Sequence, residues 1–248
     1  PPKPETVTGE LRPMNVDEVM TELARLGTAQ TKKVLMRHGM PESGFGVKVG
    51  DLKTLVKRIR RDHDLALALY DTGNSDAMYL ASLIVDDERM TKKDLKRWAD
   101  KASWQMISEY AVAWAAAESR FGWELGLEWI DSKKSKVAAS GWSTLSGVVA
   151  LRPDDELDLP ALERLLARVK QQIGSAPDRL PYVMNGFVIS VGSYVAPLFD
   201  AALTTAKGLG KVEVDMGETD CKVPDAVAML TKIRSMGRVG KKRKTVRC

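Results

Sequence analysis

Apolar residues recur at steps of three and four along nearly the whole chain, in short runs that glycines and helix-capping residues separate. The first run is typical, because Asn15 can cap a helix there and Gly27 can end it. Its apolar positions are Val16, Val19, Met20, Leu23 and Leu26. The alternation typical of strands is confined to residues 211–216, which we interpret as an extended arm rather than as part of a sheet. The chain is therefore predicted to be all-α.

The same periodicity predicts helices along the rest of the chain, joined by short polar connections. Asp51 and Ser103 are the expected N-caps of two of them, and Thr91 with Asp94 resembles a capping box. The predicted helices span residues 28–39, 51–59, 63–71, 75–85, 91–98, 103–114, 121–130, 135–151, 159–173, 181–191, 196–207 and 224–236. Such a series packs either as a globular bundle or as an α-solenoid of stacked helical pairs, and periodicity alone does not choose between them.

Charge is distributed unevenly. Residues 232–248 contain eight basic residues and no acidic one, whereas the whole chain has a net charge of +5, which leaves 5 − 8 = −3 for the rest. A basic end on a neutral-to-acidic body suggests contact with a polyanion near the C-terminus. A solubilising tail is the alternative.

Composition excludes several classes of protein. The hydrophobic share of 44% and the charged share of 29% are typical of a soluble globular protein, and no run of apolar residues is long enough for a membrane span. Residues 1–9 lack the apolar segment of a secretory signal, and two cysteines are too few for a disulfide framework. We therefore expect a cytoplasmic protein, at the nucleoid if bacterial. No spacing of metal ligands or of a phosphate-binding loop is present, so we expect neither a metal nor a cofactor.

Five segments, in this order and spacing, resemble the AlkD-like DNA alkylation repair proteins. They are residues 46–53 (GVKVGDLK), 65–71 (LALALYD), 79–87 (YLASLIVDD), 91–98 (TKKDLKRW) and the pair Ser103-Trp104. The resemblance implies HEAT-like antiparallel helical pairs, stacked into a right-handed superhelix whose concave basic face cradles DNA. It divides the chain into an N-terminal arm (1–14), a helical-repeat domain (15–207) and a C-terminal extension with a final helix and a basic tail (208–248).

The resemblance also implies a chemistry. Active members of the family hydrolyse the glycosidic bond of N3- or N7-alkylated purines, and a carboxylate stabilises the positive charge that develops on the sugar. That carboxylate is an Asp four residues after a Trp. Trp104 matches the Trp, but Ser108 stands at the carboxylate position. Glu109 follows, although one residue along an α-helix turns a side chain by about 100°. Glu109 is thus a candidate only if the helix is rotated there or the alignment slips.

Two further pocket positions of the family are altered. An Arg of the family corresponds to Ala139, just before the step Ser140-Gly141-Trp142, and a later Trp falls near Ser193. Loss of a preorganised charge slows such chemistry by roughly a hundredfold or more. We therefore expect a protein that recognises damaged or distorted duplex DNA with weak or no base excision. An active alkylpurine glycosylase and an α-solenoid scaffold for other proteins are the alternatives.

The expected DNA contacts are made to phosphates, with little sequence specificity, by a monomer. Trp104 is expected in the groove, although a Trp that opens an apolar helix is often a core residue. Three lysines lie close together in the sequence where one helical pair meets the next. Four more lysine and arginine residues follow one another in the tail. These expected contacts are Lys133, Lys134, Lys136, Lys241, Lys242, Arg243 and Lys244.

Overall fold

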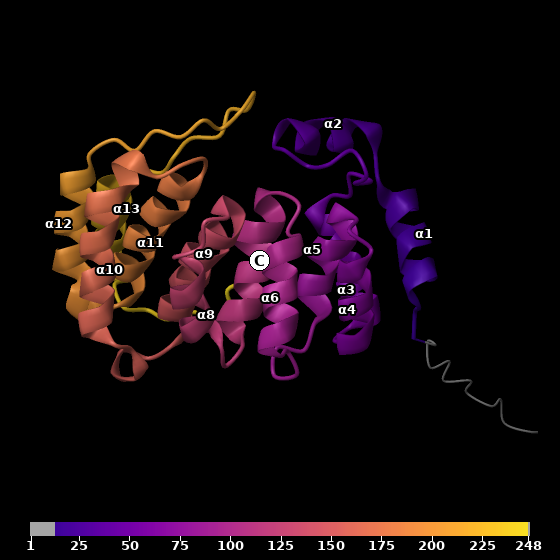
Figure 1. The fold of residues 1–248 in the computed structure, drawn as a ribbon, viewed down its shortest axis with the longest axis horizontal. Coiled ribbons are helices and arrows are strands. Elements are labelled where there is room, and N and C mark those ends of the chain that lie inside the picture. Colours follow the sequence, from indigo (N-terminus) through magenta and orange to yellow (C-terminus); the bar gives the residue numbers. More distant parts are fainter. Residues whose placement is uncertain (1–12, 248) are drawn as a thin grey trace, which may run out of the picture.

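The computed structural model describes residues 13–247, and every regular element in that range is helical. Most of the predicted N-terminal arm, residues 1–12, and Cys248 lie outside the described residues. The helices stand side by side in a curved array that runs from α1 at one end to α12 and α13 at the other (Figure 1). The prediction of an all-α chain is confirmed. Residues 211–224 contain no strand, as expected for an extended arm.

From α4 onward the helices form two layers, because successive helices alternate between them. The outer layer consists of α4 (His63–Asp71), α6 (Lys92–Lys101), α8 (Gly122–Trp129), α10 (Leu159–Gln172) and α12 (Phe199–Leu209). The inner layer consists of α5 (Ser75–Ile84), the π-helix η1 (Met106–Val112) continued by α7 (Ala113–Glu118), α9 (Ser135–Leu151), α11 (Leu180–Tyr194) and α13 (Ala226–Ser235). Each inner helix packs on its neighbours within the layer, which is how HEAT-like pairs stack. The final helix α13 packs against α11 and α12, as one more inner helix.

Three helices precede the two-layer part of the array, and short 3-10 turns join later ones. The N-terminal helices are α1 (Val16–Leu26), α2 (Ala29–Arg37) and α3 (Val49–Ile59), and the turns are η2 (Asp154–Glu156), η3 (Ile173–Ser175) and η4 (Ala196–Leu198). No single helix within residues 13–247 has the length and apolarity that a membrane span requires. The bent pair of α11 and η4–α12 meets that test only when both parts are joined across an angle of 117°.

Local capping explains most helix starts. Asn15 and Thr91 both form complete capping boxes, with Glu18 and Asp94 respectively, so the predicted box at Thr91 is confirmed. The prediction that Asp51 caps a helix was wrong. Helix α3 begins at Val49, and Asp51 lies in its first turn, where an acidic side chain favours the helix dipole.

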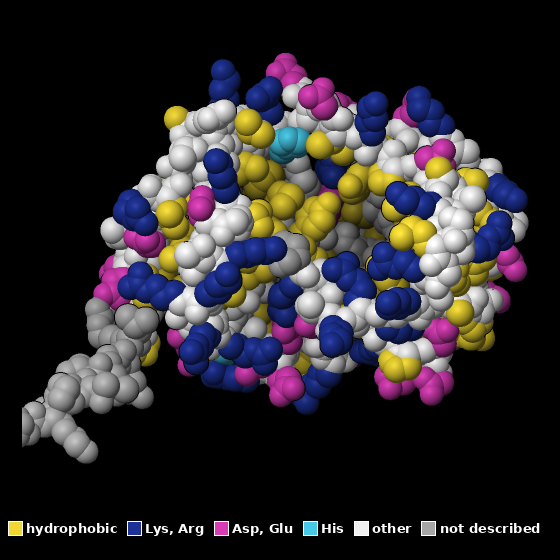
Figure 2. Space-filling view, turned by 180° about the vertical axis from the view of Figure 1, so that it is seen from behind, with side chains coloured by type: hydrophobic (Ala, Val, Ile, Leu, Met, Phe, Trp, Pro, Cys, Tyr) yellow, Lys and Arg dark blue, Asp and Glu magenta, His cyan; other side chains and the backbone are white. Residues whose placement is uncertain are grey.

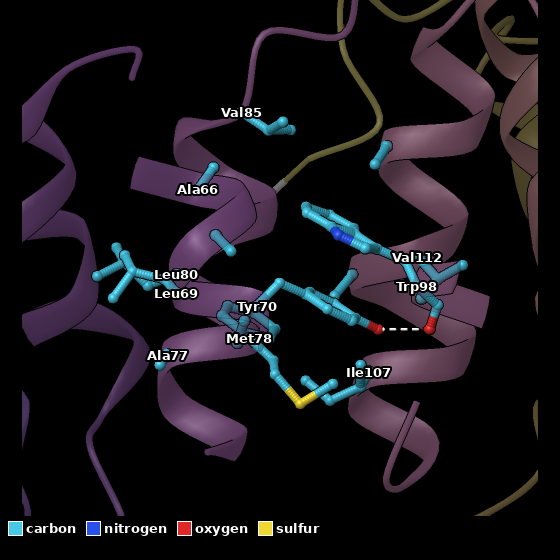
Figure 3. Close-up of a cluster of buried hydrophobic side chains, with 14 of the residues drawn as sticks. Ala66, Leu69, Tyr70, Ala77, Met78, Leu80, Val85, Trp98, Ile107 and Val112 are labelled. Carbon is cyan, nitrogen blue, oxygen red and sulfur yellow. Dashed lines mark hydrogen bonds between the residues drawn. The ribbon is translucent and has the colours of Figure 1, made fainter. Parts of the chain in front are cut away.

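A stacked aromatic pair ties α4 to α6 in the core. The rings of Tyr70 and Trp98 are nearly parallel, at 5°, with centroids 4.0 Å apart, and the Tyr70 hydroxyl donates to the Trp98 carbonyl at 2.7 Å (Figure 3). Both side chains are completely buried. The segments 65–71 and 91–98, which carry the family resemblance, therefore meet in the core through this pair.

A buried carboxylate positions the loop that follows α2. Asp76, in the first turn of α5, accepts hydrogen bonds from the backbone N–H groups of Phe45, Gly46 and Val47 at 2.6, 3.2 and 2.9 Å. Gly46 has a φ of 79°, and a Cβ there would lie 2.4 Å from the Lys32 nitrogen, so only glycine fits. The first two residues of the first segment of the resemblance, Gly46 and Val47, thus bind the Asp76 carboxylate through their backbone.

The chain leaves the helical array at two places after α12. The arm of residues 210–224 reaches across to α2, where residues 217–221 line one cavity together with Val34, Arg37 and His38 (Figure 1). The tail of residues 237–247 then runs back along the inner layer, so that the C-terminal end lies near the middle of the array (Figure 1).

The tail binds the C-terminal ends of four inner helices in reverse order. Gly240 N–H donates to the Ser193 carbonyl of α11 at 2.9 Å, and Arg243 N–H donates to the Ala150 carbonyl of α9 at 2.8 Å. Val246 N–H donates to Glu118 Oε1, at the end of α7, at 3.0 Å. Arg247 Nε donates to the Ser82 carbonyl, near the end of α5, at 2.7 Å. Basic residues are favourable at these ends, because they face the negative pole of each helix dipole.

Candidate nucleic-acid interface

The face opposite to that of Figure 1 carries a hollow with hydrophobic side chains in its walls, and Lys and Arg side chains gather around and below it (Figure 2). Helices η1, α9 and α11 of the inner layer line two cavities on their exposed side. The tryptophan cavity, of about 340 Å³, includes Trp104, Ser108, Glu109, Lys136, Ala139 and Arg179. The tyrosine cavity, of about 270 Å³, includes Tyr110, Trp114, Tyr182, Tyr194, Gly186 and Arg243. Glu109 lines both of them.

The π-helix η1 decides where Glu109 lies. The sequence predicts an α-helix capped by Ser103, but Gln105 occupies the N-cap and π-helical bonding follows from Met106. A π-helix closes its hydrogen bonds over five residues instead of four, so each residue turns the chain by a smaller angle. The rotation of about 100° expected between Ser108 and Glu109 holds for an α-helix, and the helix here is a π-helix. Both side chains line the tryptophan cavity beside Trp104.

Glu109 forms a buried ion pair with Arg179, the residue that precedes α11. Arg179 Nε and Nη2 donate to Glu109 Oε1 and Oε2 at 2.6 and 2.9 Å, and the Glu109 side chain is only 3% exposed. Burial raises the pKa of Glu109 above its usual value, and the hydrogen bonds and charge of Arg179 offset this rise in part. Pairing with Glu109 raises the pKa of Arg179, so the guanidinium stays charged.

Two more contacts reinforce this ion pair. The Arg179 guanidinium lies over the Tyr182 ring, 4.6 Å from its centroid, and Nη1 lies 3.4 Å from the Met216 sulfur in the arm. Tyr182 also interacts with Tyr110, whose pKa is raised well above its usual value, chiefly by burial. The Glu109–Arg179 ion pair thus links η1 to the start of α11, and Glu109 lines both cavities.

Helix α9 contributes small side chains to both cavities. Ala139 lies in the tryptophan cavity, whereas Ser143, Ser146, Gly147 and Ala150 lie in the tyrosine cavity. These positions recur at steps of three and four, so they share one helix face. Ala139 stands where the family resemblance places an Arg, and the structure supplies a guanidinium in this cavity from Arg179 instead. Nothing local in the sequence marks Arg179, which follows Pro177 and Asp178 in a loop.

The step Ser140-Gly141-Trp142 serves packing rather than the cavities. Ser140 Oγ donates to the Ser108 carbonyl at 2.8 Å, which fixes α9 against η1. Trp142 is 2% exposed and packs edge-on against Phe187 of α11. Ser193 is also buried, and its hydroxyl donates to the Ile189 carbonyl at 2.5 Å. Ser193 lines neither cavity, so the family position assigned to it is not reproduced there.

Trp104 forms part of the wall of its cavity but is 6% exposed. Its indole Nε1 is buried and has no hydrogen-bond partner among the described residues. Little of the ring is therefore exposed to the groove, and its expected contact with DNA stays a prediction.

Some of the lysine and arginine side chains predicted to contact DNA are exposed, whereas others are bound to groups of the protein itself. Lys136 lines the tryptophan cavity, and its Nζ donates to the Ser103 carbonyl at 2.7 Å. Lys134 is paired with Asp100 at 2.5 Å, whereas the neighbouring Lys133 is exposed. In the tail, Lys242 is held by Asp154 at 2.7 Å and by the Val149 carbonyl at 3.0 Å. The other tail cations of the prediction are exposed, namely Lys241, Arg243 and Lys244. The described residues contain no group of His, Cys, Asp or Glu that could hold a metal ion.

Comparison with known proteins places this geometry in context. A family model described as DNA alkylation repair enzyme matches residues 19–207. An uncharacterised protein of Listeria innocua is 33% identical over 225 residues, which cover 88% of this chain and 97% of that protein. An uncharacterised protein of Listeria monocytogenes is 32% identical over the same shares.

One solved structure is also similar. It represents what is described as a new family of proteins related to the HEAT-like repeat DNA glycosylases, with affinity for branched DNA structures. The TM-score is 0.85 at 36% sequence identity, and the match covers 95% of this chain and 100% of the other.

Proposed function

This chain belongs to the DNA alkylation repair family and has the HEAT-like repeat fold, and on that premise we propose that it binds branched or distorted DNA through the sugar–phosphate backbone without excising bases. The observation that carries the proposal is the face in Figure 2, where cationic side chains surround a hollow with hydrophobic side chains in its walls. Cations spread over a curved face neutralise phosphates without reading bases. The affinity for branched DNA that is stated for the similar structure supports the choice of branched DNA.

The Glu109–Arg179 ion pair argues against excision. Stabilising an oxocarbenium-like sugar requires a carboxylate whose charge faces the substrate. Both Glu109 oxygens accept hydrogen bonds from Arg179, and the side chain is 3% exposed. The charge of the Glu109 carboxylate is therefore neutralised by the Arg179 guanidinium inside the protein. Ser108 has no charge, and its hydroxyl donates back to the Trp104 carbonyl at 3.3 Å.

The binding proposal is tested with DNA of different shapes. A four-way junction, a three-way junction and a linear duplex of the same total length are titrated with the protein at several salt concentrations. We expect tighter binding to the junctions and a fall in affinity with salt that corresponds to several neutralised phosphates. Equal weak binding to all three DNAs at physiological salt would contradict the proposal and favour the scaffold alternative.

Matched variants identify the surface that binds DNA. Lys133→Ala and Lys244→Ala each remove an exposed cation from the predicted set, and each should lower the salt slope by about one. Arg164→Ala removes an equally exposed cation from outer helix α10 and should leave the slope unchanged. If Arg164→Ala lowered the salt slope as much as the other two variants do, DNA would contact the outer layer as well. That result would contradict the proposed binding surface.

The glycosylase alternative has its own assay. DNA treated with a methylating agent is incubated with the protein, and free N3-methyladenine and N7-methylguanine are quantified against the spontaneous rate. We expect no excess release. Release that Glu109→Gln abolishes, while DNA binding persists, would instead establish the enzyme.

A further inference from the structure

We propose that the tyrosine cavity receives one unpaired nucleobase of a branched DNA, with the Arg243 guanidinium on an adjoining phosphate. The inference rests on the proposed function, since it concerns the same inner face, and it adds a site that phosphate binding alone does not require. It is carried by the shape of the cavity, by the aromatic rings in its walls and by the way in which the tail holds Arg243 at its edge.

The shape of the cavity comes from a contrast in side-chain size. Helix α9 gives it a floor of Ser143, Ser146, Gly147 and Ala150, none of which projects far. On α11, Gly186 lies between larger neighbours, and a Cβ there would meet no atom within 4 Å. The walls on both sides carry aromatic side chains, so the cavity is an open slot between helices.

The walls suit a flat ring. Tyr110 and Trp114 stand one turn apart on the η1–α7 side, and Tyr182 and Tyr194 stand on the α11 side. All four side chains are partly exposed, whereas Trp98, Trp129 and Trp142 are buried in the core. Nucleobases bind proteins largely by stacking on such rings, without regard to sequence. Serine hydroxyls on the floor and Ser190 on α11 can accept or donate hydrogen bonds at a base edge.

Arg243 is anchored through its backbone, which leaves its side chain to face the cavity. Its N–H donates to the Ala150 carbonyl at the end of α9, and the preceding Lys242 is fixed by Asp154. The Arg243 side chain lines the cavity and stays exposed. A guanidinium held at the rim of an aromatic slot is placed for a phosphate next to a stacked base.

The volume of the tyrosine cavity suits one unpaired base rather than a base pair. At about 270 Å³ the cavity is slightly smaller than the pockets that hold typical small ligands, which begin near ~300 Å³. A base inside an intact duplex would have to be unpaired and unstacked first, which costs least where it is already single-stranded. Branch points supply such bases, so the cavity favours branched over linear DNA.

The test uses two three-way junctions that differ at one unpaired position in the branch, which carries a nucleotide in one and an abasic residue in the other. Stacking of one base on aromatic side chains predicts about tenfold tighter binding of the junction that carries the base. Gly186→Leu fills the slot without a clash at Cβ and replaces glycine with a better helix former. In this variant the two junctions should bind alike. Gly50→Leu, at an exposed glycine of α3 that also has open space at Cβ, should keep the tenfold preference.

The outcomes separate the two proposals. Equal binding of both junctions by the unaltered protein, or a preference that survives in Gly186→Leu, overturns the base site while phosphate binding to branched DNA stands. Failure to bind either junction at physiological salt overturns the proposed function and the base site together. Arg243→Ala should lower the salt slope by about one on the junction with the base. An unchanged slope would remove the phosphate contact from the proposal.

Discussion

Arg247 and Asp87, 160 residues apart in the chain, form a two-point ion pair, with Nη1–Oδ2 at 2.7 Å and Nη2–Oδ1 at 2.5 Å. Arg247 also lies 3.1 Å from Glu118 Oε2, and its side chain is 14% exposed. This part of the basic tail is therefore bound to the protein's own acidic residues. It connects the end of the chain to α5 and α7, in the middle of the helical array.

Arg247→Met should lower the free energy of unfolding by about 3 kcal/mol, because it leaves the mostly buried Asp87 without its partner. Lys244→Met, at an exposed position of the same tail, should change it by less than about 0.5 kcal/mol. Urea unfolding followed by circular dichroism measures both. Equal effects of the two variants would show that the tail is a loose solubilising segment.

Arg179→Met should destabilise the protein in a pH-dependent way. Burial already raises the pKa of Glu109, and loss of Arg179 removes the interactions that lower it. A carboxyl whose pKa is raised by folding contributes stability at low pH that is lost as the pH rises through the folded-state pKa. The deficit of the variant relative to the unaltered protein should reach about 3 kcal/mol at pH 7.5 and shrink toward pH 5.

The control for this prediction is the double variant Glu109→Gln with Arg179→Met. It removes the buried charge as well as its partner, so most of the loss at pH 7.5 should be recovered. A deficit that stays constant with pH, or a double variant as unstable as Arg179→Met, would mean that the ion pair is not the cause.

Asp76→Ala should cost about 3 kcal/mol or more, because three backbone N–H groups lose their common acceptor. Asp64 provides a matched control, since it also lies in the first turn of a helix but its side chain is 80% exposed. Asp64→Ala should cost at most about 1 kcal/mol. The midpoints of urea unfolding of the two variants measure this difference. Similar midpoints would show that Asp76 does not fix the loop.

Tyr70→Phe should cost about 1 to 1.5 kcal/mol, through loss of the hydrogen bond to the Trp98 carbonyl, while the stacked rings are kept (Figure 3). Tyr70→Ala should cost roughly 3 to 5 kcal/mol, because it also empties a completely buried site. Thermal unfolding ranks the two variants. A Phe variant as unstable as the Ala variant would show that the hydroxyl, and not the ring, holds α4 to α6.

Part of the candidate site is predictable from the sequence. The family resemblance makes Trp104, Ser108 and Ala139 positions of one pocket, and all three line the tryptophan cavity. Lys136 was predicted as a basic contact nearby and lines the same cavity. The pocket positions come from the family resemblance, and periodicity alone does not identify them. Ser193, matched less securely, lies elsewhere.

The sequence by itself determines the helices, most of their caps and the repeat family, because these depend on residues within a few positions of one another. Only the tertiary structure decides the chemistry of the groove. Glu109 meets Arg179 across 70 residues, and Arg247 meets Asp87 across 160, and no local pattern specifies such partners. Glu109 lies on a π-helix that periodicity did not predict, and its buried carboxylate is paired with Arg179. Periodicity assigns a residue to a face, but the charge that the residue presents there depends on what packs against it.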